Sequence, residues 1–250
     1  MTFAVRLRDR ERILGYWSVL DAPVATERIA RLGYDYVCLD MQHGLVGYSG
    51  LVASLTAIDA GGASAGVVRV EANDPTPIGR ALDAGAAAVI VPLIDNADDA
   101  AKAVAATRYP PLGRRSYGPM RSALRFGPEP AQAHTDTAVI AMIETTAGLA
   151  EVEAICATPG LDGVYVGPSD LRLAVGGAHP ADRSVDDAFE EAVRRICSAA
   201  ETAGIAAGIH TPDGASAARR LAQGYTFASI ASDLVHLENV ARDHLKEAGR

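Results

Sequence analysis

Short apolar runs alternate with helical patterns along the whole chain, and this alternation limits the fold more than any other feature. A continuous apolar run is typical of a strand that is buried on both faces of a parallel sheet. Asn73-Asp74-Pro75 opens one of the intervening helical segments and Gly85 closes it, as helix start and stop residues do. Eight strands are expected, at residues 13–19, 36–40, 66–70, 87–92, 138–144, 163–167, 205–209 and 226–231. Within 250 residues, eight such units predict a closed (β/α)8 TIM barrel rather than an open sheet.

A single barrel domain over residues 1–250 is expected, because no linker-like change in composition divides the chain. Residues 109–137 are too long for a plain connection and are typical of a lid, a binding loop or an oligomer contact, which we expect to stand over the catalytic end of the barrel. A C-terminal helix is expected at 233–247. Ser184 and Asp187 have the spacing of a capping box, which predicts a helix start there.

The charge and the cysteines exclude several classes of protein. A net charge of −8 argues against binding to nucleic acid or to an anionic membrane, because neutralising phosphates requires a positive surface. The longest apolar stretch, residues 84–94, is far shorter than the roughly 20 residues that span a bilayer. Three widely spaced cysteines indicate neither a disulfide framework nor a zinc site, so a cytoplasmic location is the simplest expectation. One local basic cluster could face an anionic ligand, a partner subunit or acidic side chains: Arg108, Arg114, Arg115, Arg121 and Arg125.

Two carboxylates follow neighbouring predicted strands. Glu144 ends the fifth run and Asp170 follows the sixth, so both side chains are expected at the same rim of the barrel. Two adjacent carboxylates repel each other, and a hard divalent cation relieves the repulsion; oxygen ligands favour Mg²⁺ or Mn²⁺ over structural zinc. The alternative is a rim carboxylate that caps a helix or pairs with an arginine.

Gly167-Pro168-Ser169-Asp170 opens a short turn or helix after the sixth run. The free backbone N–H groups of Ser169 and Asp170 would form a pocket for a carboxylate or phosphate. A simple helix start is the alternative.

Three further side chains at strand ends can take part in acid–base or electrostatic catalysis. His43 follows the second strand, and Asp40 at the strand end can accept a hydrogen bond from one ring nitrogen, which would make His43 a general base rather than a structural histidine. Arg69 ends the third strand and must find an anion inside the barrel, either Asp40 or Glu144 or an oxyanion that forms during reaction. His210, at the end of the seventh strand, is a weaker candidate.

The positions of the lysines limit the possible reaction mechanisms. Lys102 and Lys246 are the only two, and both lie in helical stretches away from any strand end. A Schiff-base mechanism therefore lacks a nucleophile, and carbon-acid chemistry here would need a metal. The seventh and eighth strands also lack the glycine-rich loops of the common barrel phosphate site, which disfavours a phosphorylated substrate.

Six motifs occur in order along the chain: Leu39-Asp40-Met41-Gln42-His43-Gly44, Val68-Arg69-Val70 with Asn73-Asp74-Pro75, Val91-Pro92, Arg108-Tyr109-Pro110-Pro111-x-Gly113-x-Arg115, Ile143-Glu144-Thr145 and Val166-Gly167-Pro168-Ser169-Asp170-Leu171. Together they resemble the HpcH/HpaI aldolase family of divalent-metal-dependent (class II) pyruvate aldolases. The resemblance covers nearly the whole chain. It implies a lyase that cleaves a 4-hydroxy-2-oxo acid to pyruvate and an aldehyde through a pyruvate enolate.

The resemblance also implies roles for individual residues. Glu144 and Asp170 would bind the metal, Mg²⁺ or Mn²⁺ with Co²⁺ as a further candidate, and the amides of Ser169 and Asp170, beside Gly167, would hold the carboxylate of the 2-oxo acid. Arg69 would contact the keto oxygen. His43, supported by Asp40, would be the base. The family also forms hexamers, which implies a homo-oligomer with the terminal helix as a contact.

Two positions depart from the family pattern, and two alternative functions stay open beside the pyruvate aldolase. Gln42 stands where many members have an acidic residue, and Met142 where many have glutamine; neither removes a metal ligand, but both change the hydrogen bonding near the metal. A related lyase could act on a CoA thioester or decarboxylate a 2-oxo diacid, with Arg108 to Arg125 as the only basic track for CoA phosphates. A non-catalytic barrel subunit is the remaining alternative.

Overall fold

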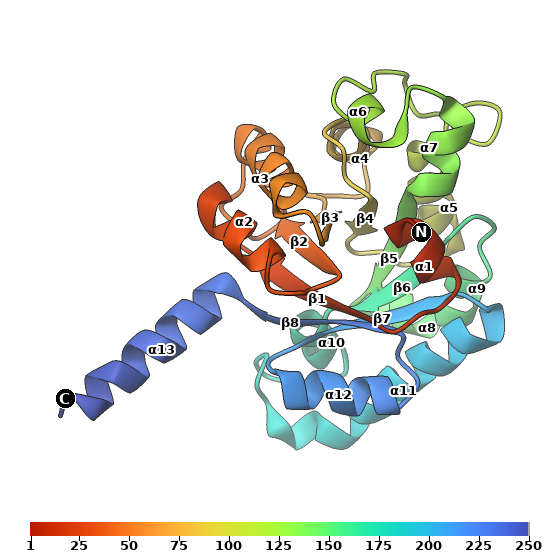
Figure 1. Cartoon of the computed structure of the whole chain (residues 1–250). Coiled ribbons are helices and arrows are strands. Elements are labelled where there is room, and N and C mark those ends of the chain that lie inside the picture. The colour runs from red at the N-terminus through yellow and green to blue at the C-terminus, as the bar shows by residue number, and fades with distance from the viewer. Residues whose placement is uncertain (250) are drawn as a thin grey trace.

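A computed structural model describes residues 1–249, and Arg250, the last residue of the expected domain, lies outside the described residues. Eight parallel strands pair in chain order and close into a barrel (Figure 1). The predicted TIM barrel is therefore confirmed. The strands are β1 (Ile13–Ser18), β2 (Tyr36–Asp40), β3 (Ala65–Arg69), β4 (Ala88–Val91), β5 (Ala138–Ile143), β6 (Gly163–Val166), β7 (Ala206–Thr211) and β8 (Phe227–Ser232).

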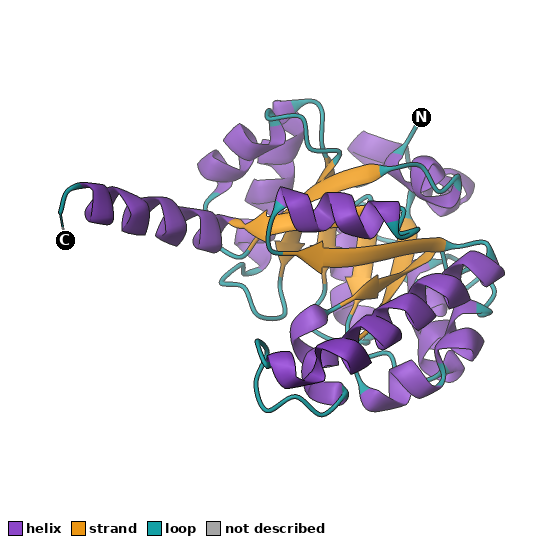
Figure 2. Cartoon of the chain, turned by 90° about the horizontal axis from the view of Figure 1, so that it is seen from below, coloured by secondary structure: helices purple, strands orange, loops and turns teal. Residues whose placement is uncertain are grey.

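Helices surround the strands on the outside of the barrel (Figure 2). Those that follow β1 to β4 are α2 (Pro23–Ala30), α3 (Tyr48–Gly61), α4 (Pro75–Asp83) and α5 (Ala97–Thr107). The second half has α8 (Thr146–Ala150), α9 (Val152–Cys156), α10 (Pro168–Ala174), α11 (Asp186–Ala203), α12 (Gly214–Ala222) and α13 (Asp233–Glu247). Apart from α13, which buries none of its residues, the apolar faces of these helices and the outward side chains of the strands form one large core.

The barrel interior is filled by large side chains packed against glycines. Tyr36 and Phe227 are almost fully buried there. A Cβ on Gly15 would lie 2.0 Å from the Tyr36 ring, and one on Gly208 would lie 2.2 Å from the Phe227 ring. These rings lie at the first residues of β2 and β8 and fill the N-terminal part of the interior, which leaves the C-terminal ends of the strands for a substrate.

The N-terminal end of the barrel is closed by the short helix α1 (Phe3–Arg8), whose buried Phe3 and Leu7 belong to the interior cluster. The segment 109–137 lies at this same end. It contains α6 (Ala123–Phe126) and α7 (Pro130–Asp136), and α7 packs beside α1 (Figure 1). The expectation that 109–137 stands over the catalytic end is wrong. It follows a helix rather than a strand, and a connection from a helix back to a strand must lie at the opposite end.

The capping box expected at Ser184 and Asp187 is also wrong. Asp182 takes the capping role instead, because its carboxylate accepts hydrogen bonds from the backbone N–H and the hydroxyl of Ser184. Residues 183–185 form a short 3₁₀ turn, and α11 then begins at Asp186 without a side-chain cap. The acidic residue two positions earlier therefore starts the helical segment.

Candidate active site

Six of the seven predicted site residues line one pocket at the C-terminal mouth of the barrel. Its volume is about 220 Å³. The seventh, Asp40, is almost completely buried behind it. The six residues that reach the pocket come from β3 and from the segments that follow β2, β5 and β6: His43, Arg69, Glu144, Gly167, Ser169 and Asp170.

Arg69 and Asp40 form a buried ion pair between adjacent strands, at paired positions of β2 and β3. Arg69 Nε donates to Asp40 Oδ1 at 2.9 Å, and Nη2 donates to Oδ2. Burial alone would raise the pKa of Asp40, but the hydrogen bonds and charge of Arg69 outweigh it, so this pKa is lowered. The pair holds the guanidinium in one orientation, with Nη1 turned toward the sulfur of Met142, 4.0 Å away.

Asp40 supports His43 through the backbone and not through the imidazole. Its Oδ1 accepts from the backbone N–H groups of Gln42 at 3.0 Å and His43 at 3.2 Å, while Oδ2 accepts from Trp17 Nε1 at 3.2 Å. The expectation that Asp40 fixes the tautomer of His43 is therefore wrong. A buried guanidinium needs a paired anion more than an exposed imidazole does, and Arg69 occupies both carboxylate oxygens. The His43 ring is left exposed at the mouth.

Glu144 is held by a strained loop. Its Oε1 accepts from the backbone N–H of Leu93 at 3.0 Å, and Leu93 has a φ of 54°, in the left-handed region that non-glycine residues rarely adopt. Burial raises the pKa of Glu144, and the charge of Asp170 raises it further. A carboxylate in this position gains from a nearby positive charge.

Gly167 makes room for the second oxygen of Glu144. A Cβ at this position would lie 2.4 Å from Glu144 Oε2. Gly167 also precedes α10, which begins with Pro168, and the first backbone N–H groups of a helix have no partner within it. The N–H groups of Ser169 and Asp170 belong to this first turn.

The sequence did not identify four residues of the pocket wall: Trp17, Val19, Tyr165 and Ser232. Trp17 lies near the end of β1, and the Arg69 guanidinium is 5.2 Å from the centre of its ring. The only sequence signal for Trp17 was an indole near the end of a predicted strand, which by itself indicates packing as readily as function.

The residues present fit a divalent cation that keeps open positions. Glu144 and Asp170 line the same pocket, and the burial of Glu144 disfavours an uncompensated charge. Among residues 1–249, no three His, Cys, Asp or Glu side chains are placed to enclose a metal. A pair of carboxylates leaves the remaining positions to water and substrate oxygens, which is the usual coordination of Mg²⁺ in enzymes.

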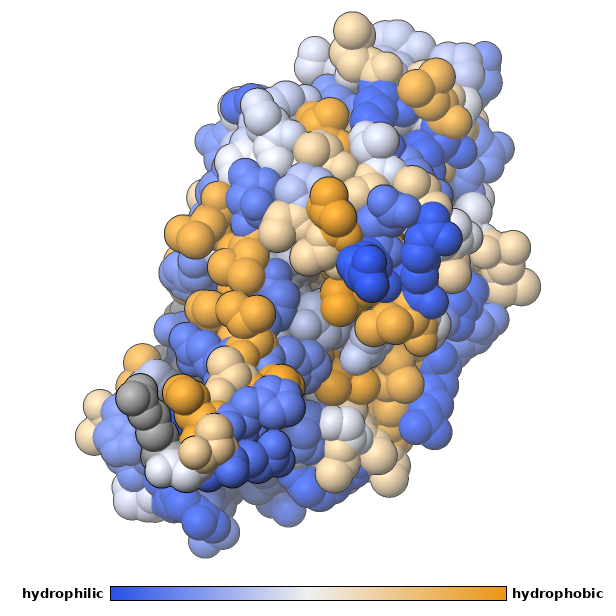
Figure 3. Space-filling model, turned by 60° about the vertical axis from the view of Figure 1, so that its left-hand side comes forward, coloured by the Kyte–Doolittle hydropathy of each residue, from blue (hydrophilic) through white to orange (hydrophobic). Residues whose placement is uncertain are grey.

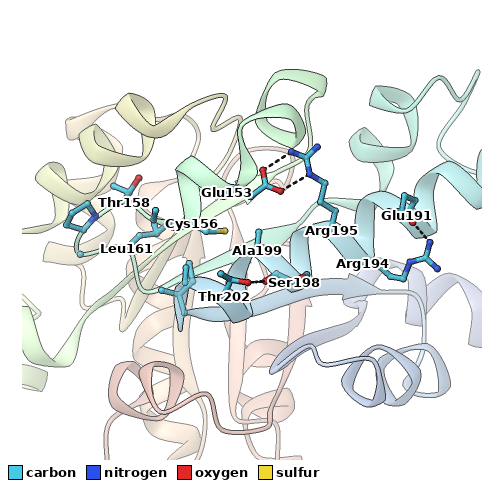
Figure 4. Close-up of a pocket in the computed structure, with 15 residues that line it drawn as sticks. Glu153, Cys156, Thr158, Leu161, Glu191, Arg194, Arg195, Ser198, Ala199 and Thr202 are labelled. Atoms are coloured by element: carbon cyan, nitrogen blue, oxygen red, sulfur yellow. Dashed lines mark hydrogen bonds and ion pairs between the residues drawn. The ribbon is translucent and has the colours of Figure 1, made fainter.

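A larger pocket of about 770 Å³ lies outside the barrel, between α9 and α11 (Figure 4). Its charged side chains are paired with each other, Arg195 with Glu153 and Arg194 with Glu191. It is lined by the residues that precede β6 and β7, at the N-terminal end of the strands. That end of a TIM barrel usually contributes to stability, so we assign no catalytic site there.

The model for the HpcH/HpaI aldolase/citrate lyase family matches residues 13–240, and the chain belongs to this family. The 5-keto-4-deoxy-D-glucarate aldolases of Salmonella arizonae and Salmonella paratyphi A are each 39% identical over 235 residues, which are 93% of this chain and 90% of the relative. The crystal structure of a family member from Burkholderia cenocepacia has a TM-score of 0.87 at 36% identity and covers 99% of this chain and 98% of that one. The predicted family and the predicted enzyme class, a metal-dependent pyruvate aldolase, are confirmed.

Proposed function

We propose that the pocket at the barrel mouth cleaves a 4-hydroxy-2-oxo acid to pyruvate and an aldehyde, reversibly, through a pyruvate enolate. One observation carries the proposal: Glu144 and Asp170 line the same small pocket as Arg69 and His43. The similarity to aldolases named for 5-keto-4-deoxy-D-glucarate favours a polyhydroxylated oxo acid as the substrate.

Glu144 and Asp170 would hold the cation, for which we propose Mg²⁺ or Mn²⁺, with Co²⁺ as a further candidate. Both provide oxygen ligands, and within residues 1–249 no histidine or cysteine is placed to complete a three-residue metal cluster with them, so a hard ion is favoured. When bound, the cation supplies positive charge where the negative charge of the enolate develops.

The other residues would bind the oxo acid and move its proton. The Nη1 group of Arg69 is not used by Asp40 and can donate to the keto oxygen, since Asp40 fixes the rest of the guanidinium. The N–H groups of Ser169 and Asp170 would hold the substrate carboxylate. The exposed ring of His43 would take the proton of the 4-hydroxyl as the carbon–carbon bond breaks.

The structure disfavours a CoA thioester as the substrate. A CoA ester needs free cations, but four of the five arginines in the basic cluster are paired with aspartates. Asp162 pairs with Arg108, Asp83 with Arg115, and Asp59 with both Arg121 and Arg125. The segment that carries most of these arginines also lies at the opposite end of the barrel from the pocket.

Pyruvate release tests the proposal. Purified protein incubated with a panel of 4-hydroxy-2-oxo acids and Mg²⁺ or Mn²⁺ should release pyruvate, measured with coupled lactate dehydrogenase. A chelator should stop the release, and added metal should restore it. Full activity after thorough chelation would refute the role of the metal.

We further propose a homo-oligomer in which a second copy of the chain covers α13. This helix extends away from the barrel (Figures 1 and 2) and buries none of its residues. Leu237, Val240 and Leu245 are each more than half exposed and recur at helical spacing. Figure 3 shows the side of the molecule that comes forward from the left of Figure 1, with apolar patches among hydrophilic side chains. An unpartnered apolar stripe on a projecting helix is typical of an interface, and the family resemblance implies a hexamer.

Charged substitutions on α13 should dissociate the oligomer. Leu237→Glu combined with Val240→Glu places two carboxylates in the proposed interface, where they would lose their hydration without a partner. We expect a smaller species in sedimentation velocity than for the wild type. The matched control, Glu238→Gln on the same helix, should keep the wild-type mass. A monomeric wild type would refute the interface.

The cysteines indicate the cellular compartment of the protein. Cys38, Cys156 and Cys197 are buried and unpaired, and we propose a reducing cytoplasm as the location. None of the helices within residues 1–249 has both the length and the hydropathy of a transmembrane segment.

A further inference from the structure

His210 is a partly buried titratable group that lines the pocket, and the proposed reaction gives it no role. It lies near the end of β7 and lines the pocket together with Arg69 and Trp17. Its Nδ1 lies 2.7 Å from Ser229 Oγ, and Ser229 Oγ is in turn hydrogen-bonded to the Tyr165 hydroxyl. The Trp17 ring packs against the imidazole edge to face, with the ring centres 5.4 Å apart.

The environment keeps this imidazole neutral. Burial and, to a smaller extent, the positive charge of Arg69 lower the pKa of His210 to about 4. At neutral pH one ring nitrogen therefore carries a proton and the other does not. Among the residues that the structure describes, Ser229 forms the only side-chain hydrogen bond to the ring, through Nδ1, and the Tyr165 hydroxyl is bonded to Ser229 in turn.

The hydroxyls can set the tautomer. When Tyr165 donates to Ser229, the single hydroxyl proton of Ser229 is free to donate to Nδ1, and the ring proton then lies on Nε2. The carboxylate and keto oxygens of an oxo acid are acceptors only. A ring that offers Nε2–H to the pocket therefore complements this half of the substrate.

The barrel topology places His210 across the pocket from Arg69. The strands close in chain order, so β3 and β7 lie on opposite sides of the ring of eight. Both side chains nevertheless reach the same pocket of about 220 Å³. A small molecule that accepts a hydrogen bond from Arg69 in this space must lie between the two.

We propose that His210 is a substrate-binding residue for the oxo-acid half, which it contacts as a neutral hydrogen-bond donor through Nε2, and that Ser229 and Tyr165 are positioning residues for its ring. This inference rests on the proposed function. It assigns the pocket a third polar contact besides Arg69 and the first turn of α10. It also gives a role to the buried Ser229 hydroxyl and Tyr165 phenol, which are hydrogen-bonded to each other in the barrel interior.

Three substitutions of His210 test the contact in the Mn²⁺-loaded protein. Glutamine reaches the position of Nε2 and can donate there, asparagine keeps a polar group near Ser229 but does not reach the pocket, and leucine removes both. We expect His210→Leu and His210→Asn to raise the Kd of pyruvate, measured by calorimetry, roughly 10- to 100-fold, as for a lost hydrogen bond to a charged group. His210→Gln should retain most of the affinity, and Ser229→Ala should give an intermediate loss.

The same series separates this inference from the proposed reaction. The KM for pyruvate in the addition direction should rise in parallel with the Kd, whereas Mn²⁺ binding measured by electron paramagnetic resonance should not change. Wild-type pyruvate affinity in both His210→Leu and His210→Asn would overturn the role of His210, even if the wild type is an active aldolase. A wild type that releases pyruvate from no 4-hydroxy-2-oxo acid would instead overturn the proposed function.

Discussion

Replacing Glu144 by glutamine is expected to abolish metal binding and to lower pyruvate release roughly 10³-fold or more. The charge of a bound cation contributes several kcal/mol to stabilising an enolate-like transition state, and about 1.4 kcal/mol corresponds to a factor of ten in rate. Glutamine has the shape of glutamate and can still accept the hydrogen bond from Leu93 N–H, which measures 3.0 Å in the wild type. The substitution therefore removes the charge and leaves the fold of the loop in place. Mn²⁺ binding by electron paramagnetic resonance and coupled pyruvate release measure the two effects.

Stability should move in the opposite direction from activity. Burial raises the pKa of Glu144, so its charge is unfavourable in the metal-free folded protein, and Glu144→Gln should match or exceed the wild-type melting temperature without metal. Glu151→Gln, an exposed substitution in the segment after the same strand, is the matched control and should change neither metal binding nor rate. Wild-type Mn²⁺ affinity in Glu144→Gln would exclude this carboxylate as a ligand.

The strands could be predicted closely because each is a short, continuous apolar run between the start and stop residues of the neighbouring helices. The predicted segment 36–40 coincides with β2, and predicted segment 138–144 extends β5 by one residue. The positions of Glu144 and Asp170 followed from the same reasoning, since the C-terminal ends of neighbouring parallel strands meet at one rim. Chain order and strand ends were sufficient to identify residues that line a common pocket.

Contacts across the barrel could not be predicted in the same way. Trp17 and His210 belong to β1 and β7, and the sequence does not say how far each side chain reaches into a closed ring. The partner of Asp40 depended on a competition between His43 and Arg69, which is decided by burial and by the forked geometry of the guanidinium. The position of residues 109–137 depended on whether the segment before it was a strand or a helix. The first two outcomes depend on tertiary structure, whereas the third depends on the local pattern of residues 97–107, which form a helix.

The second large effect is expected at Asp40, whose replacement should lower both stability and activity. Asp40→Asn leaves the guanidinium of Arg69, whose residue is 8% exposed, without a charged partner. Removing one member of a buried ion pair typically costs about 3–5 kcal/mol, so the free energy of unfolding in urea should fall by that amount. Activity should fall as well, because nothing then holds the guanidinium toward the keto oxygen.

The stability difference between the wild type and Asp40→Asn should depend on pH in a defined direction. The pKa of Asp40 is lowered in the folded protein, so the contribution of the pair to stability is complete above the unfolded pKa of about 3.9 and is lost as the pH falls through the lower folded value. The stability difference between wild type and Asp40→Asn should therefore be constant near neutral pH and shrink only in acid. A difference that disappears already near pH 6 would contradict the lowered pKa.

The double variant distinguishes a structural role from a catalytic one. Asp40→Asn combined with Arg69→Met removes both charges, and replacing a complete buried pair by uncharged side chains is often neutral for stability. We expect the double variant to recover most of the free energy of unfolding that Asp40→Asn loses, yet to remain inactive, because no guanidinium is left to contact the keto oxygen. If activity returned together with stability, Arg69 would serve only to neutralise Asp40 in the fold, and the enolate would have to be stabilised without it.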